Sequence, residues 1–223
     1  MSKIAIIAAL PGELKPLVRG WQRPEPNLWT GTIAGREAIA VAGGMGAEAA
    51  TRAVARANTK AEIDTLISYG WAGALSCAVK PPSVFTITEI IDARTGERFT
   101  TDIPSGQRLV TLDHVARSDE KRRLAETYQS VLVDMEAATV ARLATARNLA
   151  FYCFKGISDA YTDRLPDFAP FIDDRGEFRT AAFVTYAALH PAYWGALRRL
   201  GQMSSLAASE LASFVPQSLK QAL

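Results

Sequence analysis

Short, largely uninterrupted apolar runs separated by helical segments constrain the fold of this chain more than any other feature of its sequence. Residues 4–10, 65–69 and 151–157 are such runs, and the Ala-rich residues 47–57 follow a glycine turn with the composition of a helix. Apolar runs without polar alternation are typical of strands that are buried on both faces of a sheet. Strands that alternate with helices predict an α/β protein in which helices cover both faces of a central sheet.

Other segments extend this pattern along the chain. Residues 33–41 predict a pair of strands, residues 84–91 predict a strand rich in β-branched side chains, and residues 131–133 predict a very short one. Further helices are expected at 118–127 with Ser118 as the cap, and at 135–147, 180–189, 192–200 and 204–214. Residues 159–177 predict a long loop, which is either a binding loop or lid, or a plain surface excursion.

The length of the chain limits the number of its domains, and its charge distribution limits the kinds of partner that it can bind. With 223 residues, of which 48% are hydrophobic, the chain can bury one substantial core, so we expect a single domain spanning residues 1–223. Its 25 basic and 23 acidic residues are interleaved and form no one-sided basic stripe of the kind that a nucleic-acid surface requires. We therefore expect no nucleic-acid partner.

The cysteines and the N-terminal residues help to predict the cellular compartment of the protein. Cys77 and Cys153 lie in apolar settings, which favours two reduced, packed thiols over a disulfide. The start resembles a signal peptide only superficially, because its apolar run is short and Pro11-Gly12-Glu13 follows in place of a cleavage site. No stretch approaches the roughly 20 apolar residues that span a bilayer. These observations predict a soluble cytoplasmic protein without membrane insertion.

The glycine segment Gly43-Gly44-Met45-Gly46 is the first candidate for a binding site. With the helix that follows, it matches the glycine spacing of a dinucleotide-binding turn. The acid that would hold a ribose belongs at the carboxyl end of the next strand, whereas Asp64 precedes that strand. The glycines could instead let the backbone approach a small substrate at a helix N-terminus, or form a tight turn without a ligand.

Metal and serine chemistry have little support in the sequence. His114 and His190 are isolated, and neither has a recognisable zinc spacing with a cysteine or an acid. The chain also lacks a Gly-x-Ser-x-Gly elbow. We therefore expect no metal and no cofactor.

Three carboxylates are more informative. Glu13 lies just beyond the first predicted strand, Glu136 lies where a short strand enters a helix, and Asp159 ends a strand. In an open α/β sheet, ligands gather beyond the carboxyl ends of the strands, so all three acids fall where a site would form. Each also has a purely structural explanation, as a solvated helix residue, a helix N-terminal acid and a turn cap, respectively.

Several segments together resemble the nucleoside phosphorylase and nucleosidase superfamily, most closely its methylthioadenosine/S-adenosylhomocysteine nucleosidase branch. The strongest motifs are Val133-Asp134-Met135-Glu136-Ala137-Ala138 and Ile157-Ser158-Asp159, supported by residues 4–14 and by the glycine segments 43–46 and 70–73. The resemblance covers most of the chain in order. It implies a three-layer α/β/α fold with a central mixed sheet, of the phosphorylase/hydrolase-like type.

The resemblance also implies a role for each site residue. Asp159 and Glu13 would be catalytic: Asp159 would hydrogen-bond the purine and help to protonate its N7, and Glu13 would activate the attacking water. Glu136 would hold the ribose hydroxyls, Met135 would pack on the sugar, and Met45 would contact the 5′ substituent. The other substrate-binding residues that we expect are Trp71, Ala72, Gly73, Ser158 and Phe168.

The chemistry of glycosidic cleavage explains why acids are needed. Breaking the bond places positive charge on the ribosyl carbon and electron density on the base, as in other oxocarbenium-like glycosyl transfers. A positioned general acid or base contributes about 10²- to 10⁴-fold to the rate of such a step. Asp159 must therefore be protonated, or share a proton, when the purine leaves.

The chain departs from the family pattern at three places, one of which is Tyr69, a bulkier residue than the family pattern leads us to expect. Trp71 stands where the branch has a small hydroxyl residue that helps to orient the catalytic aspartate. Residues 113–122 lack a match to the family's base-stacking aromatic residue, which leaves Phe168 and Phe171 of the long loop as substitutes.

A second resemblance concerns the C-terminal part of the chain. Residues 165–179, His190-Pro191 and a helix that carries Trp194 resemble the hopanoid-associated phosphorylase group, which is linked to adenine removal from adenosylhopane. An apolar substituent at the ribose 5′ end would suit a pocket lined by Trp71, Met45 and aromatic loop residues.

The sequence therefore predicts an enzyme that releases adenine from an adenosine-type nucleoside by hydrolysis. Phosphorolysis, with phosphate in place of water, is the close alternative, although we identify no arginine pair near Gly12 or Gly44 to hold phosphate. A catalytically silent nucleoside-binding protein is an alternative from another class, motivated by Trp71. The family resemblance further implies a homodimer.

Overall fold

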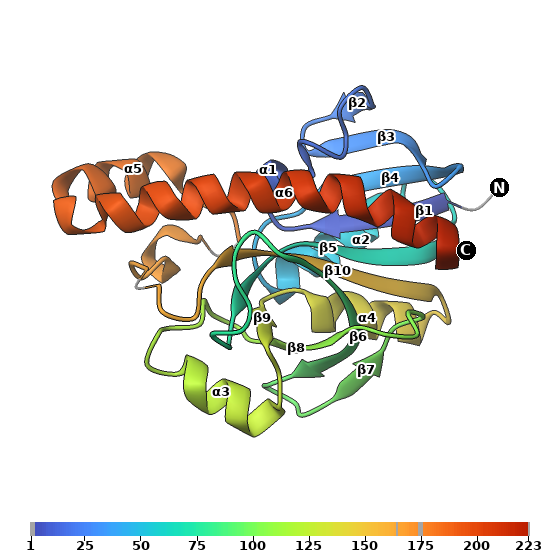
Figure 1. The fold of residues 1–223 in the computed structure, drawn as a ribbon. Coiled ribbons are helices and arrows are strands. Elements are labelled where there is room, and N and C mark those ends of the chain that lie inside the picture. The colour runs from blue at the N-terminus through green and yellow to red at the C-terminus, as the bar shows by residue number, and fades with distance from the viewer. Residues whose placement is uncertain (1–2, 164, 174–175, 223) are drawn as a thin grey trace.

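The computed structural model describes residues 3–163, 165–173 and 176–222. Within these residues the fold is built on a mixed sheet of ten strands (Figure 1). The strand order is β10-β6-β8-β9-β5-β1-β4-β3-β2, and β7 pairs with β6. The strands are β1 (Lys3–Ala8), β2 (Gln22–Glu25), β3 (Leu28–Ile33), β4 (Arg36–Ala42), β5 (Ile63–Ala74), β6 (Val84–Asp92), β7 (Arg98–Thr100), β8 (Gln107–Thr111), β9 (Leu132–Asp134) and β10 (Ala150–Asp159).

The sheet closes on itself at one end. Strand β10 pairs with β5 in parallel and with β6 in antiparallel orientation, so β5, β10, β6, β8 and β9 form a ring, from which β1, β4, β3 and β2 extend. The pairs β1–β4, β1–β5, β6–β8 and β8–β9 are parallel, whereas β5–β9 and β3–β4 are antiparallel. The mixed sheet that the sequence predicts is thus confirmed.

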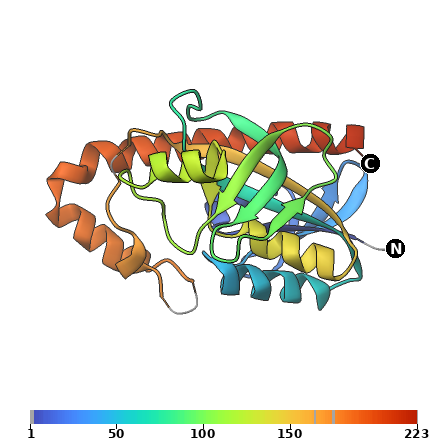
Figure 2. The same cartoon turned by 90° about the horizontal axis from the view of Figure 1, so that it is seen from below.

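Helices cover the sheet on both faces, as Figure 2 shows: α2 and α4 lie on one side and α6 on the other. The helices are α1 (Pro11–Leu14), α2 (Ala47–Asn58), α3 (Lys121–Tyr128), α4 (Ala137–Ala146), α5 (Thr180–Leu189) and α6 (Trp194–Ala222), with short 3₁₀ turns at Ala169–Phe171 and Pro191–Tyr193. The α/β/α prediction is therefore confirmed.

The packing of β1 explains why its sequence lacks polar alternation. Ala5 and Ile7 belong to the core between the sheet and the α2–α4 layer. Ile4 and Ile6 belong to a second core, which includes Leu211 of α6. Because both faces of the strand are covered, an apolar residue is favoured at every position.

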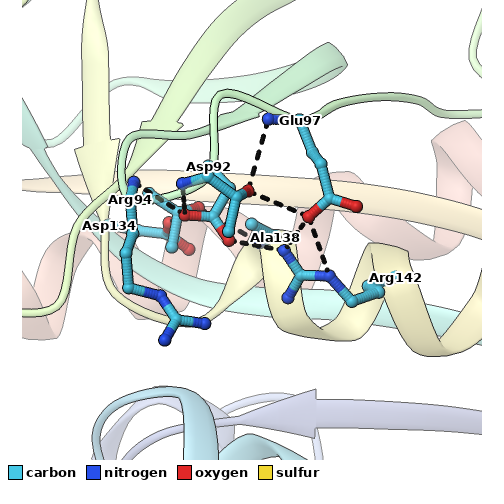
Figure 3. Close-up of polar contacts among 8 residues, drawn as sticks. Asp92, Arg94, Glu97, Asp134, Ala138 and Arg142 are labelled. Atoms are coloured by element: carbon cyan, nitrogen blue, oxygen red, sulfur yellow. Dashed lines mark hydrogen bonds and ion pairs between the residues drawn. The ribbon is translucent and has the colours of Figure 1, made fainter.

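Helix α4 is fixed to the C-terminal end of β6 by an ion-pair cluster (Figure 3). The Arg142 guanidinium lies 2.5 Å from Asp92 Oδ2 of β6 and 2.6 Å from Glu97 Oε2 of the β6–β7 connection. Asp92 Oδ1 also accepts the N–H of Arg94 at 2.9 Å. The cluster therefore fixes the position of α4, whose N-terminal cap is Glu136.

We expect Arg142→Met to lower the free energy of unfolding by about 1 kcal/mol at neutral pH, because the guanidinium is partly exposed and such pairs are weak. The hydrogen bond from Arg142 lowers the pKa of Glu97; burial raises the pKa of Asp92, but its Arg142 and backbone hydrogen bonds outweigh this. Both shifts stabilise the fold above the ordinary carboxyl pKa, and this stabilisation disappears as the pH falls through the lowered values.

Urea unfolding of wild type and Arg142→Met between about pH 7 and pH 3 measures this effect. The difference in stability should shrink toward acid pH. Arg147→Met, at the exposed C-terminal cap of the same helix, is the matched control. A difference that persists unchanged at acid pH would show that the ion pairs do not cause it.

Some expected elements differ from those observed. The helices predicted at 192–200 and 204–214 are one continuous helix, α6, because Gly201 is tolerated inside a helix that packs on the sheet. The helix predicted from residue 118 begins at Lys121, and Ser118 does not cap it. Cys153 is buried as expected, but Cys77 is exposed rather than packed. Among the described residues, no helix is long and apolar enough to cross a membrane.

Candidate active site

A cavity of about 590 Å³ lies where β1, β5, β9 and β10 end. All ten residues that the sequence analysis assigns to catalysis or substrate binding line it: Glu13, Met45, Trp71, Ala72, Gly73, Met135, Glu136, Ser158, Asp159 and Phe168. The strands β1, β5 and β10 are parallel neighbours whose carboxyl ends meet at one edge of the sheet, so residues far apart in sequence converge here.

Glu13 forms one wall of the cavity and is held by backbone donors. Its Oε2 accepts the N–H groups of Ala9 and Leu10, both at 2.8 Å, and its Oε1 accepts the N–H of Trp71 at 2.8 Å. Burial raises the pKa of Glu13, and these donors partly offset the effect. Oε1 receives one backbone donor, so it retains acceptor capacity for a further group.

Gly70 gives Glu13 the space that it occupies. A Cβ atom at Gly70 would lie 2.5 Å from Glu13 Oε1, which is closer than real Cβ contacts allow. The φ of Gly70 is +151°, a conformation that other residues rarely adopt. The glycine at this position in β5 is therefore required by the buried acid beside it.

A buried ion pair that includes the lining residue Asp134 orders the start of α4. Lys155 Nζ of β10 lies 2.8 Å from Asp134 Oδ2 of β9, and both side chains are almost fully buried. Asp134 also accepts the Thr111 hydroxyl at 2.6 Å and the N–H of Ala137 at 2.9 Å. Burial lowers the pKa of Lys155, but the negative charges around it, chiefly Asp134, more than offset this and raise it.

Glu136 connects α4 to the glycine turn. Its Oε1 accepts the N–H of Gly46 at 2.7 Å, and the neighbouring N–H of Met45 donates to Gly176 O at 2.7 Å. The turn's donors are thus bonded to protein groups, while Met45 itself lines the cavity. Burial, with a contribution from the Asp134 charge, raises the pKa of Glu136 to about 8, against the opposing effect of Lys155.

Asp159 ends β10 and is held by a residue that the sequence analysis did not identify. Lys121 Nζ, from the first residue of α3, lies 2.7 Å from Asp159 Oδ2, and Ser158 Oγ donates to Oδ1 at 3.0 Å. The sequence analysis treats Lys121 only as part of the helix expected at 118–127. The signal that could have found it is a lysine in the first helical turn, where the helix dipole disfavours positive charge.

Trp71 lines the cavity but points its polar atom elsewhere. The indole Nε1 donates to Ser204 O of α6 at 2.9 Å, and the ring lies beside Gly12. The side chain therefore does not orient Asp159 as the family's hydroxyl residue would.

Part of the cavity lining is apolar. Phe168, Phe178 and Phe183 pack together with ring centroids 5.2–6.2 Å apart. These three rings line the cavity, as do Leu165, Leu197 and Leu200. Phe171, the other expected aromatic substitute, packs instead on Phe183 and Tyr186 and does not line the cavity. Residues 164, 174 and 175 of the predicted long loop lie outside the described residues.

The segment between β8 and α3 contributes a histidine that the sequence analysis left without a role. His114 lines the cavity with Val115 and Ala116. Its ring nitrogens lie 2.6 Å from Asp113 Oδ1 and 3.0 Å from Glu120 Oε1, and the hydrogen bond to Asp113 raises the pKa of His114. Since acids engage both ring nitrogens, the imidazole is held in place where it lines the cavity.

Comparison with known families assigns the fold. The model of the phosphorylase superfamily matches residues 3–115 and 100–189. The chain belongs to the phosphorylase superfamily. Membership confirms the prediction of an enzyme of the nucleosidase and nucleoside phosphorylase class. No curated protein matches the chain at a significant level.

Several solved structures share the fold over almost the whole chain. A Campylobacter jejuni 5′-methylthioadenosine/S-adenosylhomocysteine nucleosidase matches with a TM-score of 0.73 and 15% identity, covering 99% of this chain and 100% of that one. A Helicobacter pylori nucleosidase mutant with 5′-methylthioadenosine in its active site gives 0.70 and 14%, covering 99% of both. The futalosine hydrolase of Helicobacter pylori gives 0.70 and 13%, covering 99% and 98%. Identities this low establish the fold alone.

Proposed function

We propose that this chain is a nucleosidase that releases adenine from an adenosine-type purine nucleoside by hydrolysis. The observation that carries the proposal is the convergence of Glu13, Glu136 and Asp159 on one cavity. The similar structures include a nucleosidase with 5′-methylthioadenosine in its active site, which supports a substrate of this kind.

Each acid has a role that its surroundings support. Asp159, held by Lys121 and Ser158, donates a proton to N7 of the purine as the glycosidic bond breaks. Glu136, anchored on Gly46, holds the ribose hydroxyls, and Met135 packs on the sugar. The raised pKa of Glu13 suits a general base that takes a proton from the attacking water.

The charges around the cavity favour water over phosphate as the attacking group. Among the described residues, no arginine lines the cavity, and its basic lining residues are Lys15 and His114. Phosphate binding in enzymes usually relies on arginine, whose planar guanidinium pairs with two phosphate oxygens. Phosphorolysis is therefore the second candidate, and hydrolysis the first.

The apolar part of the cavity lining favours a substrate with an apolar 5′ group. Phe168, Phe178, Phe183, Leu165, Leu197 and Leu200 line the same cavity as the acids. A methylthio group suits such a surface, and so does the larger hydrocarbon of a 5′-modified adenosine such as adenosylhopane. We place the 5′ substituent between Met45 and this wall.

Free adenine measured from a panel of nucleosides tests the proposal. The panel comprises adenosine, methylthioadenosine, adenosylhomocysteine and an adenosyl lipid, each incubated with and without phosphate. We expect release in phosphate-free buffer, fastest for a member with an apolar 5′ group. Strict phosphate dependence would defeat the hydrolytic assignment, and binding without release would favour a silent nucleoside-binding protein.

We further propose that the enzyme is a single domain over residues 1–223, forms a homodimer and works in the cytoplasm. Light scattering in solution measures the assembly. A monomer that retains full activity would contradict the dimer.

A further inference from the structure

Among the described residues, Lys121 is a buried cation with one charged partner. Its side chain is 1% exposed, and Nζ lies 2.7 Å from Asp159 Oδ2 and 3.0 Å from Ala160 O. The lysine thus joins α3 to the end of β10, at the acid that the proposed function assigns to the leaving base.

Fold stability does not account for this placement. Burying an ammonium group carries a large desolvation penalty, and replacing a buried ion pair by apolar residues is often neutral or stabilising. Lys121 is also the first residue of α3, where the partial positive charge of the helix end repels it. Residues that violate local rules in this way are often retained for function.

Other groups around the cavity do not take the place of Lys121. Lys155, the second buried lysine, pairs with Asp134 at 2.8 Å. The indole N–H of Trp71 donates to Ser204. Ser158 supplies a hydroxyl to the other oxygen of Asp159, but a hydroxyl carries no charge. Among the described residues, Lys121 is therefore the cation that forms an ion pair with Asp159.

We propose that Lys121 is a positioning residue that orients the Asp159 carboxyl group and stabilises the charge it acquires when the base departs. The inference rests on the proposed function. In the free enzyme Asp159 is the carboxylate of the ion pair, and it takes up a proton from solvent when the nucleoside binds. As the bond from the ribosyl carbon to N9 breaks, its electron pair passes to the purine, the proton on Asp159 passes to N7, and the ion pair with Lys121 forms again. The carboxylate left behind accepts a charge-assisted hydrogen bond from Lys121, which is stronger than the bond to a neutral carboxyl group. Relative to the substrate complex in which Asp159 is protonated, the interaction therefore favours the transition state.

The test compares Lys121→Met on two kinds of substrate. With the best nucleoside of the panel, we expect kcat to fall by about 10²-fold with little change in KM, because the loss concerns the chemical step. With p-nitrophenyl riboside, whose leaving group departs as a stable anion and needs no proton, the rate should stay near that of wild type. Lys121→Arg keeps the charge and should recover most of the loss.

Arg122→Met, at the next and exposed residue of α3, is the matched control and should leave both rates unchanged. An equal loss on both substrates, or no recovery with Lys121→Arg, would show a merely structural role and overturn the inference. Full activity of Lys121→Met on the nucleoside would overturn it as well. Failure of the wild type to release adenine from any nucleoside contradicts the proposed function itself, so the two failures are distinguishable.

Discussion

Asp159→Asn is expected to lower kcat for adenine release by about 10²- to 10⁴-fold, the contribution of a positioned general acid. The amide keeps the shape of the side chain at the end of β10 but cannot donate the proton that N7 requires. Steady-state assays of free adenine measure the effect. Asp163→Asn, which alters a loop acid that accepts the N–H of Ala160 and does not line the cavity, should retain the wild-type rate.

The same substitution leaves the buried Lys121 ammonium without its carboxylate. Removing one member of a buried pair costs about 3–5 kcal/mol, so a loss of activity could reflect unfolding. The double variant Asp159→Asn with Lys121→Met removes both charges and should regain stability in thermal melts while remaining inactive. Recovery of activity in the double variant would contradict the assignment of Asp159 as the acid.

Glu13→Gln is expected to lower kcat for hydrolysis by a similar factor of about 10²- to 10⁴-fold, because an amide cannot take a proton from water. The affinity for the nucleoside should change little, since the proposed role of Glu13 concerns the attacking group. Equilibrium binding and single-turnover release measure the two quantities separately.

Stability must be measured beside activity for this variant. Glu13 accepts three backbone N–H groups, and a glutamine places its own N–H₂ against at least one of them, at a cost of about 1–3 kcal/mol. Glu62→Gln, at an exposed position just before β5, is the matched control. A folded Glu13→Gln protein that hydrolyses at the wild-type rate would show that another group activates the water.

The features that the sequence predicts correctly are those with local physical causes. Buried runs such as 4–10 mark strands because both faces are covered, and an acid that follows a strand lies at a sheet edge. This reasoning places Glu13 and Asp159 beside the same cavity, where the structure has them. The two-faced packing of β1 and the extent of α2 follow from the same local patterns.

The remaining features depend on contacts between distant segments. The ion pair of Lys121 with Asp159 joins residues 38 positions apart, and no local sequence pattern predicts it. The ring of strands closes through the pairing of β10 with β5 and β6. The order of the strands along the sequence does not predict this pairing. Gly201 lies inside a continuous α6 because tertiary packing outweighs the weak helix propensity of glycine.

Calorimetric titration with a charged mimic of the reacting sugar tests directly whether these acids act around one ribose. The ligand is an iminoribitol, protonated at its ring nitrogen and carbon-linked to an adenine-like base, and the reference is the matching nucleoside. We expect the mimic to bind at least about 10²-fold more tightly, as transition-state analogues do. Equal affinity for the mimic and the nucleoside would contradict a site built to cleave the glycosidic bond.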